Sequence, residues 1–237
     1  MTDYVLVHGA FGSGRNWRKI ARLLEAKGHL VHALDLPGPE NDGTPVMQVT
    51  LDLYAASVVS LIESLDRKVI LAGHSMGGLV ISAVAERIPE KIMGLVYVTA
   101  LLVRNGQAGF EIPLGSSSSA PSGFDPASGY ITMPGEAAAA LFYNCCSEDD
   151  RAEALAVLRE KQALAPLLTP LQLTQEKFGR VPRHYVECLQ DKAIHLDIQR
   201  AMRTAWPCES VATLDVDHAP YRCRPVELAN YLNGLGG

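Results

Sequence analysis

Short apolar runs alternate along the chain with longer segments whose apolar residues recur at helical spacing. The apolar runs lie at residues 4–8, 30–36, 69–73, 93–102, 184–191 and 210–216. Helical patterns lie between or after them, at 16–28, 51–65, 78–92, 195–206 and 225–235. Continuous apolar strands separated by amphipathic helices are typical of a parallel sheet covered on both faces. The pattern predicts an α/β fold with a mostly parallel, six-stranded sheet.

One long segment, residues 103–180, interrupts this alternation. It opens with a stretch rich in Gly, Ser and Pro, residues 104–136, and continues with helical patterns from about 136 to 178. An insertion that follows a strand of an open parallel sheet lies at the edge where such sheets bind ligands. We therefore expect one domain over residues 1–237 with a helical cap or lid at about 103–180; a disordered linker is the alternative.

A serine stands in a small turn, GHSMGG at residues 73–78, between an apolar strand and a helix. Gly73, Ser75 and Gly77 form the pattern G-x-S-x-G, and this strand–turn–helix setting is the one that a nucleophile elbow requires. The sharp turn leaves no room for Cβ atoms two residues on either side of the serine, and the helix start directs N–H groups to the same place. Ser75 is therefore the candidate nucleophile.

A serine nucleophile needs a general base, and the base needs an acceptor that fixes its tautomer. His218 follows the last predicted strand, and Asp191 follows the strand before it, which gives the chain order serine, acid, histidine. Asp215 lies in the predicted strand, and Asp217 is too near His218 in sequence to face its ring. The predicted triad is Ser75, His218 and Asp191.

Acyl transfer also needs N–H donors that face the developing oxyanion. The backbone amides of Met76, after the serine, and Ala10, in the first loop, are the candidates. Residues predicted to line the substrate pocket are Phe11, His74, Leu141 and Phe142. The alternative for Leu141 and Phe142 is a place in the core of the cap, and His74 can instead hydrogen-bond within the elbow.

The first loop also resembles a dinucleotide-binding motif. GAFGSG, residues 9–14, follows a strand, and Asp35 ends the next strand about 20 residues later. The glycine spacing is G-x-x-G-x-G rather than G-x-G-x-x-G, however, and a dinucleotide site leaves Ser75, Asp191 and His218 without a role. We therefore expect no cofactor.

Composition narrows the partners. A formal net charge of −5 and a pI of about 5.8 argue against binding to nucleic acid or anionic membranes. The sequence has no signal-peptide pattern and no long apolar span, which predicts a soluble, cytoplasmic protein and is compatible with a homodimer. The five cysteines show no metal-ligand spacing, so we expect ordinary thiols and no metal site. They are Cys145, Cys146, Cys188, Cys208 and Cys223.

Several of these stretches together resemble the plant methylesterase and hydroxynitrile lyase branch of the α/β-hydrolases, including its bacterial esterase relatives. The similar stretches are VLVHGAFGSGRNW (5–17), GHSMGG (73–78), LFYNCCSED (141–149), LTQEKFGRVPRHYVECLQDKAI (173–194) and VDHAPYRCRP (216–225). The resemblance implies the same triad and the same oxyanion hole. This chain departs from the plant pattern at Gly12 and Ser13, over 115–135, and at His195.

Two chemistries share this branch. The better-known plant lyases resemble the esterases but carry a threonine and a lysine at the positions of Gly9 and Ala219. Without a cation beside the leaving group a lyase loses its main electrostatic stabilisation, whereas an ester needs only the triad and the oxyanion hole. The sequence therefore predicts a serine carboxylesterase for small, largely apolar methyl or aryl esters, with an acyl-enzyme intermediate. The alternatives are a hydroxynitrile lyase and a non-catalytic binder of small ligands.

Overall fold

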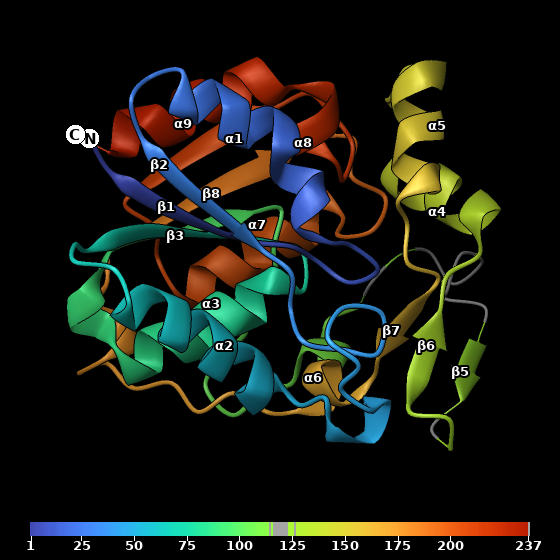
Figure 1. Cartoon of the computed structure of the whole chain (residues 1–237), viewed down its shortest axis with the longest axis horizontal. Helices are drawn as coiled ribbons and strands as arrows, with labels where there is room; N and C mark the ends of the chain where they lie inside the picture. Colours follow the sequence, from blue (N-terminus) through green and yellow to red (C-terminus); the bar gives the residue numbers. More distant parts are fainter. Residues whose placement is uncertain (114, 116–122, 126, 237) are drawn as a thin grey trace.

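The computed structural model describes residues 1–113, 115, 123–125 and 127–236, and its centre is a six-stranded sheet (Figure 1). All neighbouring strands pair in parallel, in the order β2-β1-β3-β4-β8-β9. The strands are β1 (Asp3–Val7), β2 (Leu30–Leu34), β3 (Val69–His74), β4 (Ile92–Val98), β8 (Arg183–Cys188) and β9 (Ser210–Leu214). The predicted α/β fold with six parallel strands is confirmed.

Helices cover both faces of this sheet. The helices are α1 (Arg18–Glu25), α2 (Leu51–Glu63), α3 (Gly77–Arg87), α7 (Leu196–Ala205), α8 (Pro220–Cys223) and α9 (Pro225–Leu235). Helices α1 and α9 lie on one face, and α2, α3 and α7 lie on the other (Figure 1). Strand β3 is buried along its whole length, which explains its continuous apolar run, and α3 is buried from Gly77 to Ala85.

The strand order places the site. The chain runs from β1 outward to β2 and then returns to β3 on the other side of β1. The connections that leave the carboxyl ends of β1 and β3 therefore diverge, and a crevice opens between them. The loop after β1 and the GHSMGG turn after β3 both lie at this crevice.

The insertion between β4 and β8 differs from its predicted form. It holds a three-stranded antiparallel sheet of β5 (Gly123–Asp125), β6 (Tyr130–Thr132) and β7 (Lys161–Ala163), together with α4 (Gly135–Phe142), α5 (Glu148–Ala156) and α6 (Ala165–Leu168). The expectation of helices throughout 136–178 was wrong, because β7 interrupts them and no helix forms over 169–177. Strands of three residues are too short to show an alternating pattern. Part of the Gly/Ser/Pro-rich stretch, residues 114, 116–122 and 126, lies outside the described residues.

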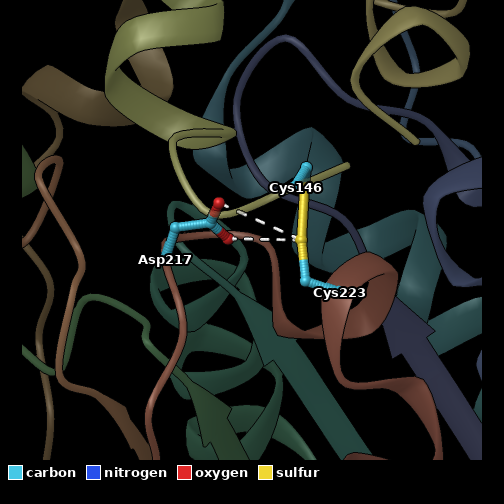
Figure 2. Close-up of side chains that lie close together, drawn as sticks. All are labelled: Cys146, Asp217 and Cys223. Atoms are coloured by element: carbon cyan, nitrogen blue, oxygen red, sulfur yellow. Dashed lines mark hydrogen bonds between the residues drawn. A yellow bond between two sulfur atoms is a disulfide. The ribbon is translucent and has the colours of Figure 1, made fainter. Parts of the chain in front are cut away.

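Two cysteines form a disulfide, which corrects the expectation of ordinary thiols. Cys146, between α4 and α5, is bonded to Cys223 at the end of α8, 77 residues away (Figure 2). Asp217 lies beside them and completes a group of three potential metal ligands. Because the two sulfurs are bonded to each other, neither is available as a thiolate ligand. No described helix is both long and apolar enough to cross a membrane.

The disulfide predicts a specific loss of stability. We expect the Cys146→Ser/Cys223→Ser variant to lose roughly 2 to 4 kcal/mol of unfolding free energy, because the closed loop no longer restricts the unfolded chain. Urea unfolding measures this loss, and the exposed thiol Cys145 supplies the control, since Cys145→Ser keeps the bond. Titration of the denatured, unreduced protein should find only the three free thiols. Five reactive thiols would contradict the pairing.

Candidate active site

The turn at Ser75 is as crowded as the sequence predicts. Ser75 has a φ of 51°, in the left-handed region, between the end of β3 and the start of α3. A Cβ at Gly73 would lie 2.6 Å from the Gly77 carbonyl oxygen, and one at Gly77 would lie 2.8 Å from the Val7 carbonyl oxygen. Both distances are below van der Waals contact, so only glycine fits. The turn has the geometry of a nucleophile elbow, with Ser75 at its tip.

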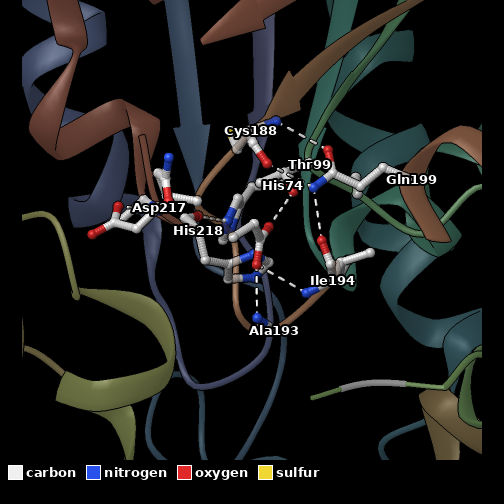
Figure 3. A network of polar contacts seen from close by, with 12 residues as sticks. His74, Thr99, Cys188, Ala193, Ile194, Gln199, Asp217 and His218 are labelled. Carbon is white, nitrogen blue, oxygen red and sulfur yellow. Dashed lines mark hydrogen bonds and ion pairs between the residues drawn. The ribbon is translucent and has the colours of Figure 1, made fainter. Parts of the chain in front are cut away.

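The side chains of His218 and Asp191 are in contact, and His218 lines a cavity together with Ser75. His218 Nδ1 lies 2.7 Å from Asp191 Oδ2, and both side chains are buried. The other carboxylate oxygen accepts the amides of Ala193 at 2.7 Å and Ile194 at 2.9 Å. The Thr99 hydroxyl also donates to Asp191 (Figure 3). A carboxylate only accepts hydrogen bonds, so Nδ1 carries the ring proton and Nε2 is the acceptor, as a general base requires.

The loop that carries Asp191 is held by a buried glutamine on α7. Gln199 donates to the carbonyls of Cys188, at 3.1 Å, and Ile194, at 2.7 Å, and accepts the Cys188 amide at 3.0 Å (Figure 3). These three bonds connect the end of β8 to the start of α7, and Asp191 lies between them. Gln199 therefore fixes the backbone of the loop on which Asp191 lies.

His74 supports the histidine from the other side. His74 Nε2 donates to the His218 carbonyl at 2.7 Å, and the two rings lie 4.6 Å apart. Burial, and then the charge of His218, lower the pKa of His74 well below its ordinary value. A neutral ring at this position fits the bond that it makes, and it adds no second positive charge beside His218.

The two other acids near His218 have different partners. Asp217 accepts the amides of Cys145 at 2.6 Å and Ala219 at 3.0 Å, and burial raises its pKa. Asp215, just after β9 rather than within it, accepts from the Gln190 side chain. The structure thus brings Asp191, and neither of these, to the His218 ring.

The backbone amides of Ala10 and Met76 are the predicted oxyanion donors, and both residues line one cavity with Ser75. Neither donates a hydrogen bond within the described part of the chain. The loop that carries Ala10 is shaped by His8, whose Nδ1 donates to the Gly9 carbonyl at 2.8 Å. His8 Nε2 in turn accepts the Leu36 amide at 3.1 Å, so this ring is neutral. Burial lowers the pKa of His8 to about 4, in agreement with those two bonds.

Two cavities meet at Ser75. The larger encloses about 550 Å³, its open mouth included, and Ser75 is its only polar side chain among the described lining residues. Its lining includes Ala10, Phe11, Met76, Leu141 and Phe142, and also Leu101, Ile131, Met133, Leu167, Ala193 and Ile194. The smaller encloses about 320 Å³ and contains His74, His218, Asn16, Tyr143 and Tyr221, together with Ala10, Phe11 and Phe142. Every predicted site residue except Asp191 therefore lines one or both cavities. Ser75 and His218 share the smaller one, although no hydrogen bond joins their side chains among the described residues.

This arrangement has known counterparts. The model of the alpha/beta hydrolase family matches residues 4–230. The chain belongs to this family. Salicylic acid-binding protein 2 of Nicotiana tabacum is 32% identical over 95% of this chain and 93% of its own length. Methylesterase 2 of Arabidopsis thaliana is 31% identical over 97% of this chain and 94% of its own.

A solved structure agrees. A pyrethroid hydrolase from Sphingobium faniae superposes with a TM-score of 0.89 at 28% identity, over 99% of this chain and 97% of that one. The predicted resemblance to esterases of this family is confirmed, and the chain is accordingly a carboxylic ester hydrolase of the alpha/beta hydrolase family. The dinucleotide-binding alternative has no support, since Asp35 instead accepts the Gly14 amide at 2.9 Å.

Several supporting residues were not predicted from the sequence. Thr99 and Gln162 form hydrogen bonds to segments far away in the chain, and Gln199 bonds to the nearer Cys188 and Ile194. Nothing in their local sequence marks those contacts. His8 ends the first apolar run, residues 4–8, and no role was predicted for it. Its direct position before the Gly-rich loop was the one signal that could have identified it.

The lowered pKa of His8 predicts a pH-dependent stability. The unfolded chain binds a proton at His8 near pH 6.5, whereas the folded chain binds it only near 4. Stability from this residue is therefore complete above pH 6.5 and is lost as the pH falls toward 4. Between pH 7 and pH 5 we expect His8 to account for about 2 kcal/mol. The unfolding free energy of His8→Asn, measured in urea, should decrease by that much less over this interval, and equal slopes would contradict the burial of a neutral ring.

Proposed function

We propose that the protein is a serine carboxylesterase that hydrolyses small, largely apolar esters through an acyl-enzyme intermediate. Ser75 is the nucleophile, His218 is the general base, Asp191 orients His218, and the amides of Ala10 and Met76 form the oxyanion hole. The observation that carries this proposal is the position of Ser75, which lies where the cavity containing His218 meets a larger apolar cavity.

The chemistry follows from these positions. His218 Nε2 accepts the Ser75 proton while Oγ attacks the ester carbonyl, and the two amides stabilise the oxyanion. The protonated His218 then donates to the departing alcohol, and Asp191 stabilises its positive charge. Water, activated by the same ring, hydrolyses the acyl-enzyme and releases the acid. No metal or cofactor takes part in this proposal.

The cavities define an orientation for the substrate. The leaving oxygen must face His218, so the alcohol part occupies the smaller, more polar cavity, with Asn16, Tyr143 and Tyr221 around it. The acyl part then occupies the larger cavity, whose described lining residues offer no charge and no hydrogen-bonding side chain apart from Ser75. An uncharged ester with a bulky apolar acid and a small alcohol fits this division.

The names of the relatives agree with this substrate class. They include a methylesterase, a pyrethroid hydrolase and a salicylic acid-binding protein. The last name is compatible with a ligand-binding role, but a receptor needs no His218–Asp191 pair beside a serine on a nucleophile elbow. The complete constellation therefore supports catalysis.

The residues at two positions, Gly9 and Ala219, disfavour the lyase alternative. A Cβ at Gly9 would lie 2.8 Å from both His74 Nδ1 and Ser75 Cβ, so a threonine does not fit there without movement of the elbow. Ala219 is completely buried, and no lysine stands in its place to stabilise a departing cyanide. Ester hydrolysis needs neither group.

We also propose that residues 1–237 act as one domain whose insertion forms a cap over the acyl cavity. The insertion supplies Ile131, Met133, Leu141, Phe142 and Leu167 to the cavity wall. A cytoplasmic location and a homodimer stay predictions. The three free thiols agree with a reducing compartment, whereas the Cys146–Cys223 disulfide is more typical of an oxidising one.

Replacement of the nucleophile tests the proposal directly. We expect Ser75→Ala to lower kcat by about 10⁴- to 10⁶-fold while the melting temperature changes little, because the attacking oxygen is lost from an otherwise intact site. The exposed Ser64→Ala provides the matched control and should keep full activity. A serine-directed phosphonate should label a peptide that contains Ser75. A Ser75→Ala enzyme with a tenth of wild-type activity would exclude the proposed nucleophile.

A substrate panel tests the orientation and the reaction class. A methyl ester of a bulky aromatic acid should have a higher kcat/KM than its isomer with a small acid and a bulky alcohol, and a negatively charged acyl group should be a poor substrate. Mandelonitrile should release cyanide only at the uncatalysed rate. The reverse preference between the two isomers would refute the orientation, and Ser75-dependent cyanide release would identify a lyase instead.

A further inference from the structure

Phe11 has an unusual backbone conformation next to the proposed oxyanion donor. Its φ is 60°, in the left-handed region, although it is neither glycine nor asparagine. The residue is buried, and its ring lines both cavities at Ser75. Such a conformation persists only where the surrounding structure stabilises it. The source of that stabilisation therefore matters for the position of Ala10.

Both backbone polar groups of Phe11 are bonded to the insertion. The Phe11 N–H donates to Gln162 Oε1 at 3.3 Å, and the Phe11 carbonyl accepts the Arg159 N–H at 2.9 Å. Gln162 lies on β7 and is 6% exposed. The loop after β1 and the insertion are far apart in sequence, so these bonds connect the oxyanion loop to the segment above the acyl cavity.

The orientation of the Gln162 amide is defined by its other partners. Gln162 Nε2 donates to the Tyr54 hydroxyl at 3.2 Å and to the Ala163 carbonyl at 3.0 Å. Because both NH₂ protons are used there, the amide oxygen faces Phe11. Tyr54 belongs to α2, so Gln162 joins the insertion, a helix of the main sheet and the oxyanion loop.

The Ala10 N–H lies in the peptide plane that also contains the Gly9 carbonyl, and the next plane fixes the chain on the other side of Ala10. The Gly9 carbonyl accepts from His8 Nδ1 at 2.8 Å and from the Gly12 amide at 3.3 Å. The next plane contains the Phe11 N–H, which donates to Gln162 at 3.3 Å. Without the second support, Phe11 would bury an unpaired N–H in a strained conformation, and the loop would relax.

We propose that Gln162 is a positioning residue for the oxyanion hole, which acts by accepting the Phe11 N–H and so keeps the Ala10 amide directed at the reacting carbonyl. The inference rests on the proposed esterase function. An oxyanion donor works only within hydrogen-bond distance of the developing charge, and a displacement of about 1 Å can cost roughly 100-fold in rate. Gln162 touches no substrate, so its effect appears in the transition state rather than in substrate binding.

The test compares Gln162→Leu with the wild type. The leucine removes the acceptor at similar volume, and we expect kcat to fall by about 10- to 100-fold while KM changes less than about threefold. A trifluoromethyl ketone, which forms an oxyanion adduct with the serine, should bind Gln162→Leu more weakly by the same factor as the loss of kcat/KM.

Gln107→Leu is the matched control. Gln107 Oε1 also accepts a backbone N–H within the insertion, that of Arg104 at 3.0 Å, but Gln107 lines neither cavity. This variant should keep wild-type kcat. A kcat for Gln162→Leu equal to that of wild type would overturn the positioning role, and so would a loss confined to KM.

Two further variants cover a Gln162→Leu protein that does not fold and separate the failure of the esterase proposal from the failure of the Gln162 proposal. If Gln162→Leu does not fold, Tyr54→Phe replaces it, because this change removes only the hydroxyl that orients the Gln162 amide. We expect a decrease of about threefold or more in kcat at unchanged KM, and an unchanged kcat would overturn the proposal. Ser75→Ala distinguishes the two levels of inference: an active Ser75→Ala enzyme refutes the esterase mechanism itself, whereas an inactive one together with a fully active Gln162→Leu refutes only the role of Gln162.

Discussion

The close approach of backbone segments around Ser75 is the constraint on which the rest of the site depends. The end of β3, the start of α3 and the end of β1 approach so closely that a Cβ at Gly9, Gly73 or Gly77 would lie less than 3.0 Å from neighbouring atoms. This crowding forces Ser75 into the left-handed region and raises its side chain above the sheet. Ala10 and Met76 line one cavity together with Ser75. The same packing thus determines the positions of the nucleophile and of its two proposed donors.

The insertion supports the two parts of the proposed machinery, the Asp191–His218 pair and the oxyanion loop, at different points. Asp191 and His218 are bonded within the main domain, by Thr99 and His74, and the insertion bonds the neighbouring Asp217 through the Cys145 amide. The backbone of the oxyanion loop is itself bonded to the insertion, through Gln162 and Arg159. The insertion therefore does more than cover a cavity. Changes in its sequence reach the reacting carbonyl through the backbone of Phe11 as well as through the pocket wall.

The sequence predicted those features that depend on local pattern or on strand order. The six strands follow from apolar runs, the elbow follows from the spacing of Gly73 and Gly77, and the pairing of Asp191 with His218 follows from their places after consecutive strands of a parallel sheet. Long-range side-chain contacts had no such signal. The β5-β6-β7 sheet consists of three-residue strands, and the bonds of Gln162 and Gln199 join residues whose neighbours in sequence reveal nothing about them. The disulfide likewise depends on a chain path that the Cys spacing does not encode.

The apolar wall of the larger cavity also bears on the end of the catalytic cycle. In the proposed orientation, an uncharged ester enters and the acid that leaves carries a negative charge at neutral pH. The carboxylate of this acid forms at Ser75, beside His218 and the proposed oxyanion donors, while its apolar part stays in the larger chamber. Among the described residues, that chamber has no cation and no hydrogen-bonding side chain apart from Ser75. The chamber therefore binds ester and acid through the same apolar part, and it adds no contact that would favour the charged product over the uncharged substrate.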